Sequence, residues 1–386
     1  MTMQSLQLFP DKLAEFGTTI FTVMSELANK HGAINLSQGF PNFPVDGELI
    51  GLVNKHMREG KNQYAPMAGV ADLRQKISDK VLAATGTRYA PDLEITVTAG
   101  ATQAIFTAVA ATISPGDEVI MFAPAYDCYA PAVRLYGGIP VFIDLIAPEF
   151  KVDWEAVRSA VTPRTRLIIV NTPHNPSATV WTKADMLQLG QILDETDILL
   201  ISDEVYEHII FDGVEHWSAA RFDALAARTF LIASFGKTFH ATGWKAGYVC
   251  APEALMSRFR KIHQYLVFSV NTPVQYALAD YLEEPARYQS VAAFYQAKRD
   301  LFLDALQGSR FTCLPAQGAY FQVLDYRAIS DELEADFARR LTIESKVAAI
   351  PLSGFYPKER EQHILRFCFA KTDETILQAA EILRNL

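Results

Sequence analysis

The sequence predicts an α/β fold, in which a mostly parallel sheet lies between helices, together with a smaller α+β domain. Three observations lead to this prediction. Short apolar runs alternate with longer helical patterns through the middle of the chain. The runs are continuously apolar, which is typical of strands that helices cover on both faces. After about residue 281 the alternation ends, and a mixture of helix and strand patterns follows.

The elements of the expected sheet follow one another in order. Residues 94–100 (EITVTAG) predict a strand that leads into a helix of small residues at 101–113. Residues 118–126 (EVIMFAPAY) predict the next strand. The later elements are expected as strands at 166–176, 197–206 and 229–237, with a helix around 182–195.

Polar residues stand where these apolar runs end. Asn171, Asp203 and Ser234 are 32 and 31 residues apart, about the length of one strand–helix–strand unit. Because ligands of such sheets bind beyond the carboxyl ends of the strands, we expect polar side chains to converge in one crevice. The residues expected there are Asn171, Asn175, Asp203, Tyr206, Ser234 and Lys237.

The C-terminal part of the chain predicts a second domain. A long amphipathic helix is expected at about 283–307, followed by strands at 318–326, 346–352 and 363–370 and helices near 331–345 and 373–384. A helix near residues 18–30 is expected to pack against this part. The predicted division is an N-terminal segment at 1–40 that packs with the small domain, a large domain at 41–280 and the small α+β domain at 281–386.

Composition and charge restrict the class of partner. The chain is 50% hydrophobic and 20% charged, as compact folded proteins are. A net charge of −9 without a run of basic residues argues against nucleic acid or an anionic membrane as the main partner. No secretory signal, membrane-length apolar stretch or CxxC pair is present, so we expect a cytoplasmic protein with reduced cysteines.

Several common motifs are absent. No two glycines stand two positions apart, which excludes the GxGxxG dinucleotide fingerprint. The P-loop, HExxH and GxSxG motifs are also missing, and the eight histidines show no metal-ligand spacing. The sequence therefore predicts no metal site, and the simplest dehydrogenase, P-loop, zinc-protease and serine-hydrolase interpretations are removed.

A lysine and an acid stand in unusual places. Lys237 follows an apolar run in SFGKTFHATGWKAGY, where its amine would be held at the end of a buried strand. Asp203 ends the run ILLIS, where a carboxylate needs a cationic partner such as a protonated pyridine nitrogen. A helix N-cap or a salt bridge would explain Asp203 equally well. Tyr206, three residues further on, could reach the same crevice.

A possible anion site lies at the first strand-to-helix junction. Gly100, Ala101 and Thr102 stand where free backbone N–H groups and the positive end of a helix can hold a phosphate. Ser234 and Lys245 could add a hydroxyl and a charge. A tight turn capped by Thr102 would account for the same residues equally well.

Three further residues have both a functional and a structural interpretation. Arg366 interrupts the apolar run ILRFCF, and its guanidinium matches a carboxylate, although an internal salt bridge would also explain it. Asn175 lies between two prolines. Its side-chain amide could be positioned to donate a hydrogen bond to a ligand, or Asn175 could be an ordinary turn residue. Tyr126 could stack on a ring or belong to the core.

Taken in order, these segments resemble a known family. INLSQGFPNF, NQYAPMAGV, NTPHNPSATVW, ISDEVYEHI, SFGKTFHATGWKAGY and LRFCFAK are similar to segments of the class I pyridoxal-phosphate aminotransferases. The resemblance runs from about residue 15 to the C-terminus. It is closest to the branch that contains kynurenine aminotransferases and bacterial methionine aminotransferases, with the bacterial methionine enzymes nearest. The chain has GWKAGY where many class I enzymes have GxRxG. Lys245 therefore offers the single charged amine of a lysine in place of the planar guanidinium of an arginine, which can donate two parallel hydrogen bonds.

The resemblance implies fold type I, pyridoxal 5′-phosphate as cofactor and a role for each candidate. Lys237 would bond to the cofactor aldehyde and act as general base, and Asp203 would pair with the pyridine nitrogen. Tyr206 and Asn175 would hydrogen-bond the phenolic oxygen of the ring, with Asn171 nearby. The other implied roles are phosphate binding by Gly100, Ala101, Thr102, Ser234, Lys245 and Tyr64 of the neighbouring subunit, ring stacking by Tyr126, and binding of the substrate carboxylate by Arg366, Asn175 and the backbone of Gly39.

The resemblance also implies an activity. We expect a homodimer with shared active sites that moves the amino group of methionine and aromatic amino acids to a 2-oxo acid by a two-step ping-pong mechanism, with kynurenine and glutamine as further donors. Elimination from cysteine conjugates on the same site stays open as the alternative, whereas a regulator built on this fold would need a DNA-binding segment that the sequence does not show. Candidate walls of the substrate pocket, each of which could equally be core, are Phe21, Phe40, Tyr126, Phe268 and Phe355.

Overall fold

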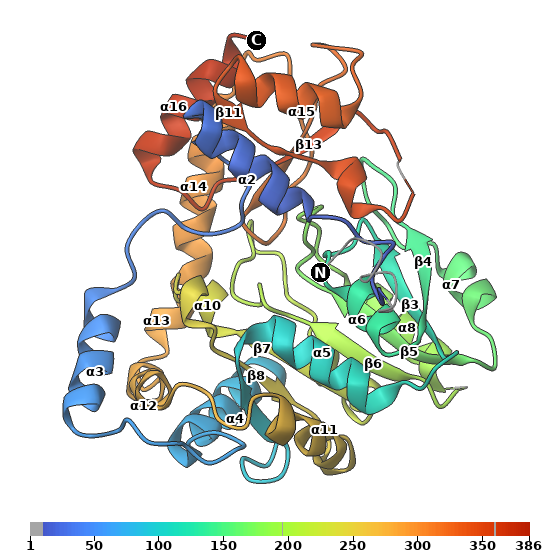
Figure 1. The fold of residues 1–386 in the computed structure, drawn as a ribbon, viewed down its shortest axis with the longest axis vertical. Coiled ribbons are helices and arrows are strands. Elements are labelled where there is room, and N and C mark those ends of the chain that lie inside the picture. Colours follow the sequence, from blue (N-terminus) through green and yellow to red (C-terminus); the bar gives the residue numbers. More distant parts are fainter. Residues whose placement is uncertain (1–10, 195, 359) are drawn as a thin grey trace, which may run out of the picture.

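The computed structural model describes residues 11–194, 196–358 and 360–386. Its larger half is built on a seven-stranded sheet between helices (Figure 1). In spatial order the strands are β2 (Ile95–Thr98), β8 (Gly247–Cys250), β7 (Thr229–Ser234), β6 (Leu199–Asp203), β5 (Thr165–Asn171), β3 (Glu118–Ala123) and β4 (Ile139–Asp144). Strand β8 runs antiparallel to both of its neighbours, and the other adjacent pairs are parallel. The prediction of a mostly parallel sheet is therefore confirmed.

Both faces of this sheet are covered, which explains the continuous apolar runs. Ile168 and Val170 of β5 belong to the core cluster that includes helix α8 (Lys183–Asp194). Leu167 and Ile169 of the same strand pack on the opposite face, with helices α5 (Gly100–Thr112) and α11 (Glu253–Leu266). Successive residues of a strand thus enter two different cores, as the alternation of side chains in a strand requires.

Two strands of the sheet were not expected from the sequence. Strand β4 lies at the edge, is only partly buried and contains Pro140, a residue that argues against a strand inside a sheet. Strand β8 has four residues and begins with Gly247, so its pattern in the sequence is weak.

The smaller half contains a second sheet, of four strands, in the order β12 (Ile350–Pro351), β13 (Ile364–Cys368), β10 (Phe321–Asp325) and β9 (Thr312–Cys313). Its neighbouring strands are antiparallel. The helices of this half are α14 (Val291–Ala305), α15 (Glu334–Ile343) and α16 (Asp373–Arg384). The strands and helices expected after residue 318 are thus present, with residues 346–352 divided between β11 (Val347–Ala348) and β12.

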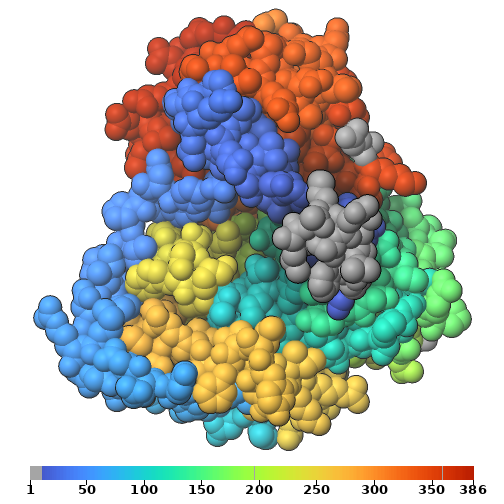
Figure 2. Space-filling model, in the orientation of Figure 1, coloured from blue at the N-terminus to red at the C-terminus, as the bar shows by residue number. Residues whose placement is uncertain are grey.

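Helix α2 (Ile20–His31) and strand β1 (Ile34–Asn35) of the N-terminal segment pack against the smaller half. Helix α2 lies against α15, and β1 pairs with β11 in parallel. Figure 2 shows this helix, in blue, against the orange and red C-terminal residues. The segment that follows β1 therefore begins beside the smaller half and continues toward the large sheet.

The prediction of a single helix at 283–307 is wrong. Helix α12 (Thr272–Tyr281) ends before this range, and the range itself holds α13 (Ala286–Gln289) and α14, separated at Ser290. Pro285 has no N–H to donate to a preceding turn and is the N-cap of α13, so no helix runs from residue 283 through this position. The remaining helices are α3 (Gly47–Arg58), α4 (Ala71–Thr85), α6 (Tyr129–Leu135), α7 (Trp154–Ala160), α9 (Asp223–Ala226) and α10 (Phe235–Thr238), with short 3-10 turns η1 (Ala219–Arg221), η2 (Thr242–Trp244) and η3 (Leu352–Phe355).

None of the helices in residues 11–194, 196–358 and 360–386 combines the length and apolarity that crossing a membrane requires. The four cysteines are free thiols.

Candidate active site

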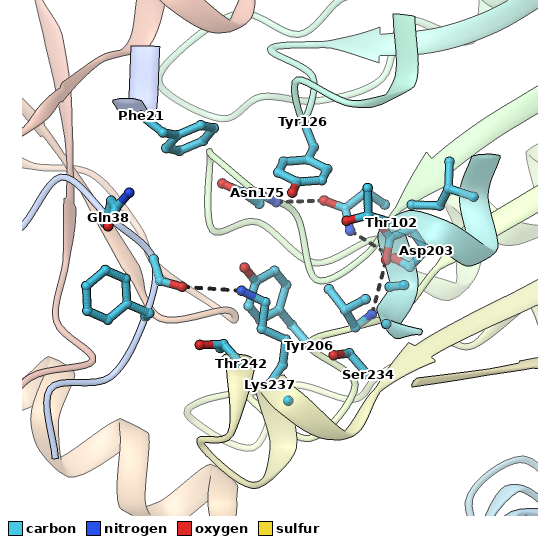
Figure 3. A pocket seen from close by; sticks show the side chains of 18 of the residues that line it. Phe21, Gln38, Thr102, Tyr126, Asn175, Asp203, Tyr206, Ser234, Lys237 and Thr242 are labelled. Atoms are coloured by element: carbon cyan, nitrogen blue, oxygen red, sulfur yellow. Dashed lines mark hydrogen bonds between the residues drawn. The ribbon is translucent and has the colours of Figure 1, made fainter. Parts of the chain in front are cut away.

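A cavity of about 230 Å³, open to solvent, lies at the carboxyl ends of strands β5, β6 and β7 (Figure 3). The first turn of α5 and residues 38–40 also line it. The structure brings most of the residues named from the sequence to this one place. They are Phe21, Gly39, Phe40, Gly100, Ala101, Thr102, Tyr126, Asn171, Asn175, Asp203, Tyr206, Ser234, Lys237, Lys245 and Arg366.

Three expected residues do not line the cavity. Phe355 is buried next to it, with its ring 5.5 Å from that of Phe21. Tyr64 and Phe268 pack edge to face, 5.3 Å apart, and their exposed fractions are 83% and 48%. These two rings therefore lie on the surface of the chain, away from its own cavity.

Lys237 is presented to the cavity by α10, the turn that directly follows strand β7. Its Nζ donates to the hydroxyl of Tyr320 at 2.7 Å and to the carbonyl oxygen of Gly39 at 3.3 Å. Burial lowers the pKa of Lys237 to about 8. An amine with this pKa is neutral in roughly a tenth of molecules at pH 7, far more than an ordinary lysine, and the neutral form is the one that a nucleophile or general base requires.

Asp203 is the last residue of β6 and is 3% exposed. Tyr129 donates to its Oδ2 at 2.6 Å, and the N–H of Val205 donates to its Oδ1 at 3.3 Å. Burial nevertheless raises the pKa of Asp203 to about 6. Within the described part of the chain no cation pairs with this carboxylate, so the salt bridge considered from the sequence is not formed.

A chain of hydrogen bonds connects Asp203 to Arg366. The side-chain amide of Asn171 donates to the backbone oxygen of Asp203 at 2.9 Å, and its Oδ1 accepts from the N–H of Asn175 at 2.8 Å. The Oδ1 of Asn175 in turn accepts from Nη1 of Arg366 at 2.7 Å. The register of β5 on β6, which sets Asn171 opposite Asp203, fixes the first of these bonds.

Arg366 is a fully buried cation whose hydrogen-bond partners are neutral. Its Nη2 donates to the backbone oxygen of Ser37 at 2.7 Å, and its Nε has no partner among the described residues. The guanidinium carbon lies 4.0 to 5.2 Å from the ring centres of Phe321, Phe21 and Phe355. Burial lowers the pKa of Arg366 to about 10. A buried guanidinium with no carboxylate in hydrogen-bond contact could accept a carboxylate ligand.

The first turn of α5 forms a place for an anion. Gly100 has a φ of +79°, and a Cβ at this position would lie 3.3 Å from Nζ of Lys245. Ala99, and not Thr102, is the N-cap, and no side chain caps the helix. The capped turn considered from the sequence is therefore not formed, and free N–H groups and a lysine amine lie together at the positive end of the helix.

Sequence reasoning missed several residues that the structure places at the site, among them two tyrosines, a glutamine and a phenylalanine. Tyr129 and Tyr320 contact the acid and the lysine, and Gln38 and Phe321 line the cavity. The tyrosines and Phe321 stand in apolar stretches that are typical of a core. Gln38 follows Ser37 in the segment INLSQGFPNF, which the family resemblance already included.

The comparisons with known proteins agree on one family. The profile described as "Aminotransferase class I and II" matches residues 32–383. The methionine aminotransferase of Escherichia coli is 50% identical over 97% of both chains, and the kynurenine–oxoglutarate transaminase of Dictyostelium discoideum is 33% identical over 97% of this chain and 95% of that one. The crystal structure of YbdL from Escherichia coli, described as having a methionine aminotransferase function, superposes with a TM-score of 0.96 at 49% identity, covering 98% and 99% of the two chains.

Proposed function

Because the chain belongs to the class I and II aminotransferases, we propose that its cavity binds pyridoxal 5′-phosphate and moves amino groups from methionine and aromatic amino acids to 2-oxo acids. Its fold type I architecture and its aminotransferase activity, both expected from the sequence, are confirmed by these relatives. Enzymes of this family and fold depend on pyridoxal phosphate. The cysteine-conjugate elimination considered as the alternative is not favoured.

The observation that carries the proposed cofactor is the arrangement around one cavity of three groups that form no ion pair among the described residues. Lys237 offers an amine, Asp203 offers a buried carboxylate without a cation, and the first turn of α5 beside Lys245 offers an anion site. A pyridine ring with an aldehyde and a phosphate has one partner for each of these groups. The residues present therefore fit the cofactor.

When bound, the cofactor would supply an aldehyde carbon and a ring that withdraws electrons from the substrate Cα. In the resting enzyme Lys237 would hold the aldehyde of the cofactor. Once the substrate has released Lys237 from the aldehyde, the lysine amine would carry the proton taken from the substrate Cα. Asp203 would keep the ring nitrogen protonated, because the cation and the carboxylate stabilise each other in a buried site. Tyr206 and Asn175 would hydrogen-bond the phenolic oxygen, and Tyr126 would stack on the ring.

Arg366 would hold the substrate carboxylate. Its guanidinium donates to Asn175 and Ser37, which are neutral, so an incoming carboxylate would be the first anion to accept a hydrogen bond from it among the described residues. The aromatic rings around the guanidinium keep water from it. The backbone of Gly39 would complete this end of the site.

The proposed preference for methionine and aromatic amino donors is supported by the aromatic rings in and beside the cavity and by the activities named for the related aminotransferases. Phe21 lies 6.5 Å from Tyr126 and 5.5 Å from Phe355, between ring centres, and Phe40 lines the mouth of the cavity. Such a wall suits the side chains of methionine and aromatic amino acids and discriminates weakly between them. Kynurenine and glutamine are further donors under this proposal.

We also propose a homodimer. Tyr64 and Phe268, exposed on the surface of one chain, are the residues that would meet a second copy, and Tyr64 would reach the phosphate bound by that copy. The division into residues 1–40, 41–280 and 281–386 is kept as part of the proposal. It is supported by the distribution of the two sheets and by the packing of α2 on α15.

An absorbance titration tests the proposed function. The purified protein, supplied with pyridoxal phosphate, is expected to absorb near the visible range, and methionine added without an acceptor is expected to change this absorbance. A 2-oxo acid added next should restore it. Lys237→Ala protein should show neither change at the wild-type rate. Bound cofactor whose absorbance does not respond to any amino acid would contradict the proposal.

A further inference from the structure

Tyr320 is a buried tyrosine directly before strand β10 whose hydroxyl is shared by two parts of the site. The hydroxyl accepts a hydrogen bond from Nζ of Lys237 at 2.7 Å and donates to the carbonyl oxygen of Gly39 at 2.5 Å. Burial raises the pKa of Tyr320 well above its ordinary value, so the hydroxyl is neutral throughout the physiological range. It is therefore an acceptor for the lysine amine and not a counter-ion.

The two acceptors determine how the amine is oriented. A lysine nitrogen has three positions besides its bond to carbon, occupied by N–H groups or by one lone pair. Tyr320 and the carbonyl of Gly39 take two of them, and Figure 3 shows the bond to Gly39. The third position is left to the cavity that Lys237 lines.

From this geometry we propose that Tyr320 is a further catalytic residue, whose hydroxyl holds the free amine of Lys237 and thereby sets which position of the nitrogen faces the substrate. The proposal rests on the function proposed above. In the loaded enzyme the lone pair at that position would accept the proton from the substrate Cα, and the electron pair left on Cα would be withdrawn into the ring of the cofactor. The same position would later give the proton to the carbon that had been the aldehyde carbon. The amine ends with the protons that it began with, and no other reactant is needed.

Tyr320 also connects three segments that lie far apart in the sequence. Gly39 approaches it so closely that a Cβ on Gly39 would lie 3.3 Å from the Tyr320 ring and 2.8 Å from that of Phe321. Lys371 holds the next residue of the same segment by donating to the backbone oxygen of Phe40 at 2.7 Å. The hydroxyl thus fixes the lysine relative to the backbone that lines the substrate end of the cavity.

Tyr295 provides a matched control. It is equally buried, and its ring centre lies 5.5 Å from that of Tyr320. Its hydroxyl bonds to Nδ1 of His240 at 2.9 Å and makes no hydrogen bond to Lys237. Removal of either hydroxyl leaves an aromatic ring in the same part of the core, so the two variants differ mainly in the contact with the lysine. The other titratable groups that act on Lys237 stay unchanged in both: Cys368, Lys245, Arg366, Asp203 and Tyr206.

The direct test measures the pKa of Lys237 in cofactor-free protein. Competitive acetylation with acetic anhydride across a pH series, read by peptide mass spectrometry, gives this pKa for the wild type, Tyr320→Phe and Tyr295→Phe. The buried ammonium loses a hydrogen-bond acceptor in Tyr320→Phe, so the pKa of Lys237 is expected to fall by about one unit. At pH values below the pKa, the neutral fraction of the amine then becomes about tenfold larger. Tyr295→Phe should match the wild type. Equal values in all three proteins would overturn the proposal.

A second readout uses the cofactor-loaded enzyme. With methionine, Tyr320→Phe is expected to lower kcat about tenfold, to change KM little, and to raise the isotope effect from deuterium at Cα, because proton transfer becomes slower. A purely structural tyrosine would lower the unfolding temperature and leave the isotope effect unchanged. If Tyr320→Phe does not fold, Tyr320→3-fluorotyrosine keeps the ring and weakens the acceptor, so the pKa of Lys237 should still fall; an unchanged pKa would again overturn the proposal.

The two proposals can fail separately. Reduction of loaded wild-type protein with borohydride shows whether Lys237 carries the cofactor, whereas the acetylation series needs no cofactor. Attachment at Lys237 with no effect of Tyr320→Phe would remove the role of Tyr320 and leave the proposed function intact.

Discussion

At the scale of single residues, the site is defined by buried charges that the described chain leaves without counter-ions. Asp203 is surrounded by neutral donors, and Arg366 by neutral acceptors and aromatic rings. Burial of either charge is costly until a ligand of opposite charge arrives. Binding energy is thus available at the two ends of the cavity, one for a ring cation and one for a carboxylate.

Asp203 makes the stability of the cofactor-free protein depend on pH. Its pKa is raised to about 6 in the folded state, so its contribution to stability is present at low pH and is lost as the pH rises through about 6. An aspartate in the unfolded chain has a pKa of about 3.9, so roughly half of this loss has already occurred at pH 5. Asp203→Asn is therefore expected to raise the unfolding temperature of cofactor-free protein at pH 8, and to raise it by roughly half as much at pH 5. Calorimetry at the two pH values measures this difference.

With the cofactor bound, Asp203→Asn is expected to be less stable than the wild type. Saturating pyridoxal phosphate is expected to stabilise the wild type more than Asp203→Asn, because only the wild type offers a charge to the ring nitrogen. A variant that gains as much stability from the cofactor as the wild type does would contradict the role of Asp203.

Arg366→Lys tests the carboxylate site. Lysine keeps the charge and loses the fork, so kcat/KM for methionine is expected to fall about a hundredfold, mainly through a higher KM. Steady-state kinetics with methionine, together with binding of a dicarboxylate or 2-oxo acid inhibitor, measures the loss. Unchanged KM would show that the carboxylate binds elsewhere.

Sequence reasoning reached Asp203 and Arg366 because a charge within an apolar run has a cost that requires a partner. It did not reach Tyr129 or Tyr320, since a tyrosine in an apolar stretch is ordinary core. Their roles depend on which side chain lies 2.6 or 2.7 Å away across the fold, and local sequence does not contain that information.

At the scale of secondary structure, the site is assembled from the ends of strands. Strands β5, β6 and β7 each end in a polar residue at the same edge of the sheet, and α5 begins beside β8. The spacing of Asn171, Asp203 and Ser234 predicted this convergence. The sequence did not reveal β8, although this strand brings Lys245 to the first turn of α5.

Gly247→Ala tests the close approach of β8 to its neighbours. A Cβ at this position would lie 2.7 Å from the backbone oxygen of Ala233 and 3.2 Å from the N–H nitrogen of Ala101, so β8 and the first turn of α5 must separate. We expect a loss of about 1–3 kcal/mol in the free energy of unfolding and weaker binding of pyridoxal phosphate. Denaturant unfolding and a cofactor titration measure the two effects.

Gly190→Ala is the control for this substitution. Gly190 lies within α8, and its added Cβ would meet only Leu225, at 4.0 Å. The free energy of unfolding is expected to rise by about 0.5–1 kcal/mol, since alanine is the better helix former. If both variants lost the same stability, the close contact at Gly247 would not be the cause.

At the scale of the whole molecule, the cavity lies where the larger half, the smaller half and the N-terminal segment meet (Figure 1). Lys237 comes from the first, Arg366 from the second and Gly39 from the third. Tyr64 is exposed and does not line this cavity in its own chain. The resemblance to the family suggested a second subunit for it, which neither periodicity nor burial within one chain can supply.

The proposed dimer can be tested through Tyr64. The protein is expected to sediment at twice its chain mass of 42.9 kDa, and Tyr64→Phe should keep this mass while weakening pyridoxal phosphate binding about tenfold. Analytical ultracentrifugation and a cofactor titration give both values. Tyr265→Phe, at a tyrosine with an 87% exposed side chain, is the control and should bind like the wild type. A monomer with full cofactor affinity would contradict the shared site.

The measurement that tests the central claim most directly is the location of the covalent bond to the cofactor. Active protein loaded with pyridoxal phosphate is reduced with borohydride, digested and sequenced by mass spectrometry. We predict the added mass on Lys237 alone, and its loss when methionine is present before reduction. Added mass on Lys245 or on any other lysine, or none in active protein, would contradict the account.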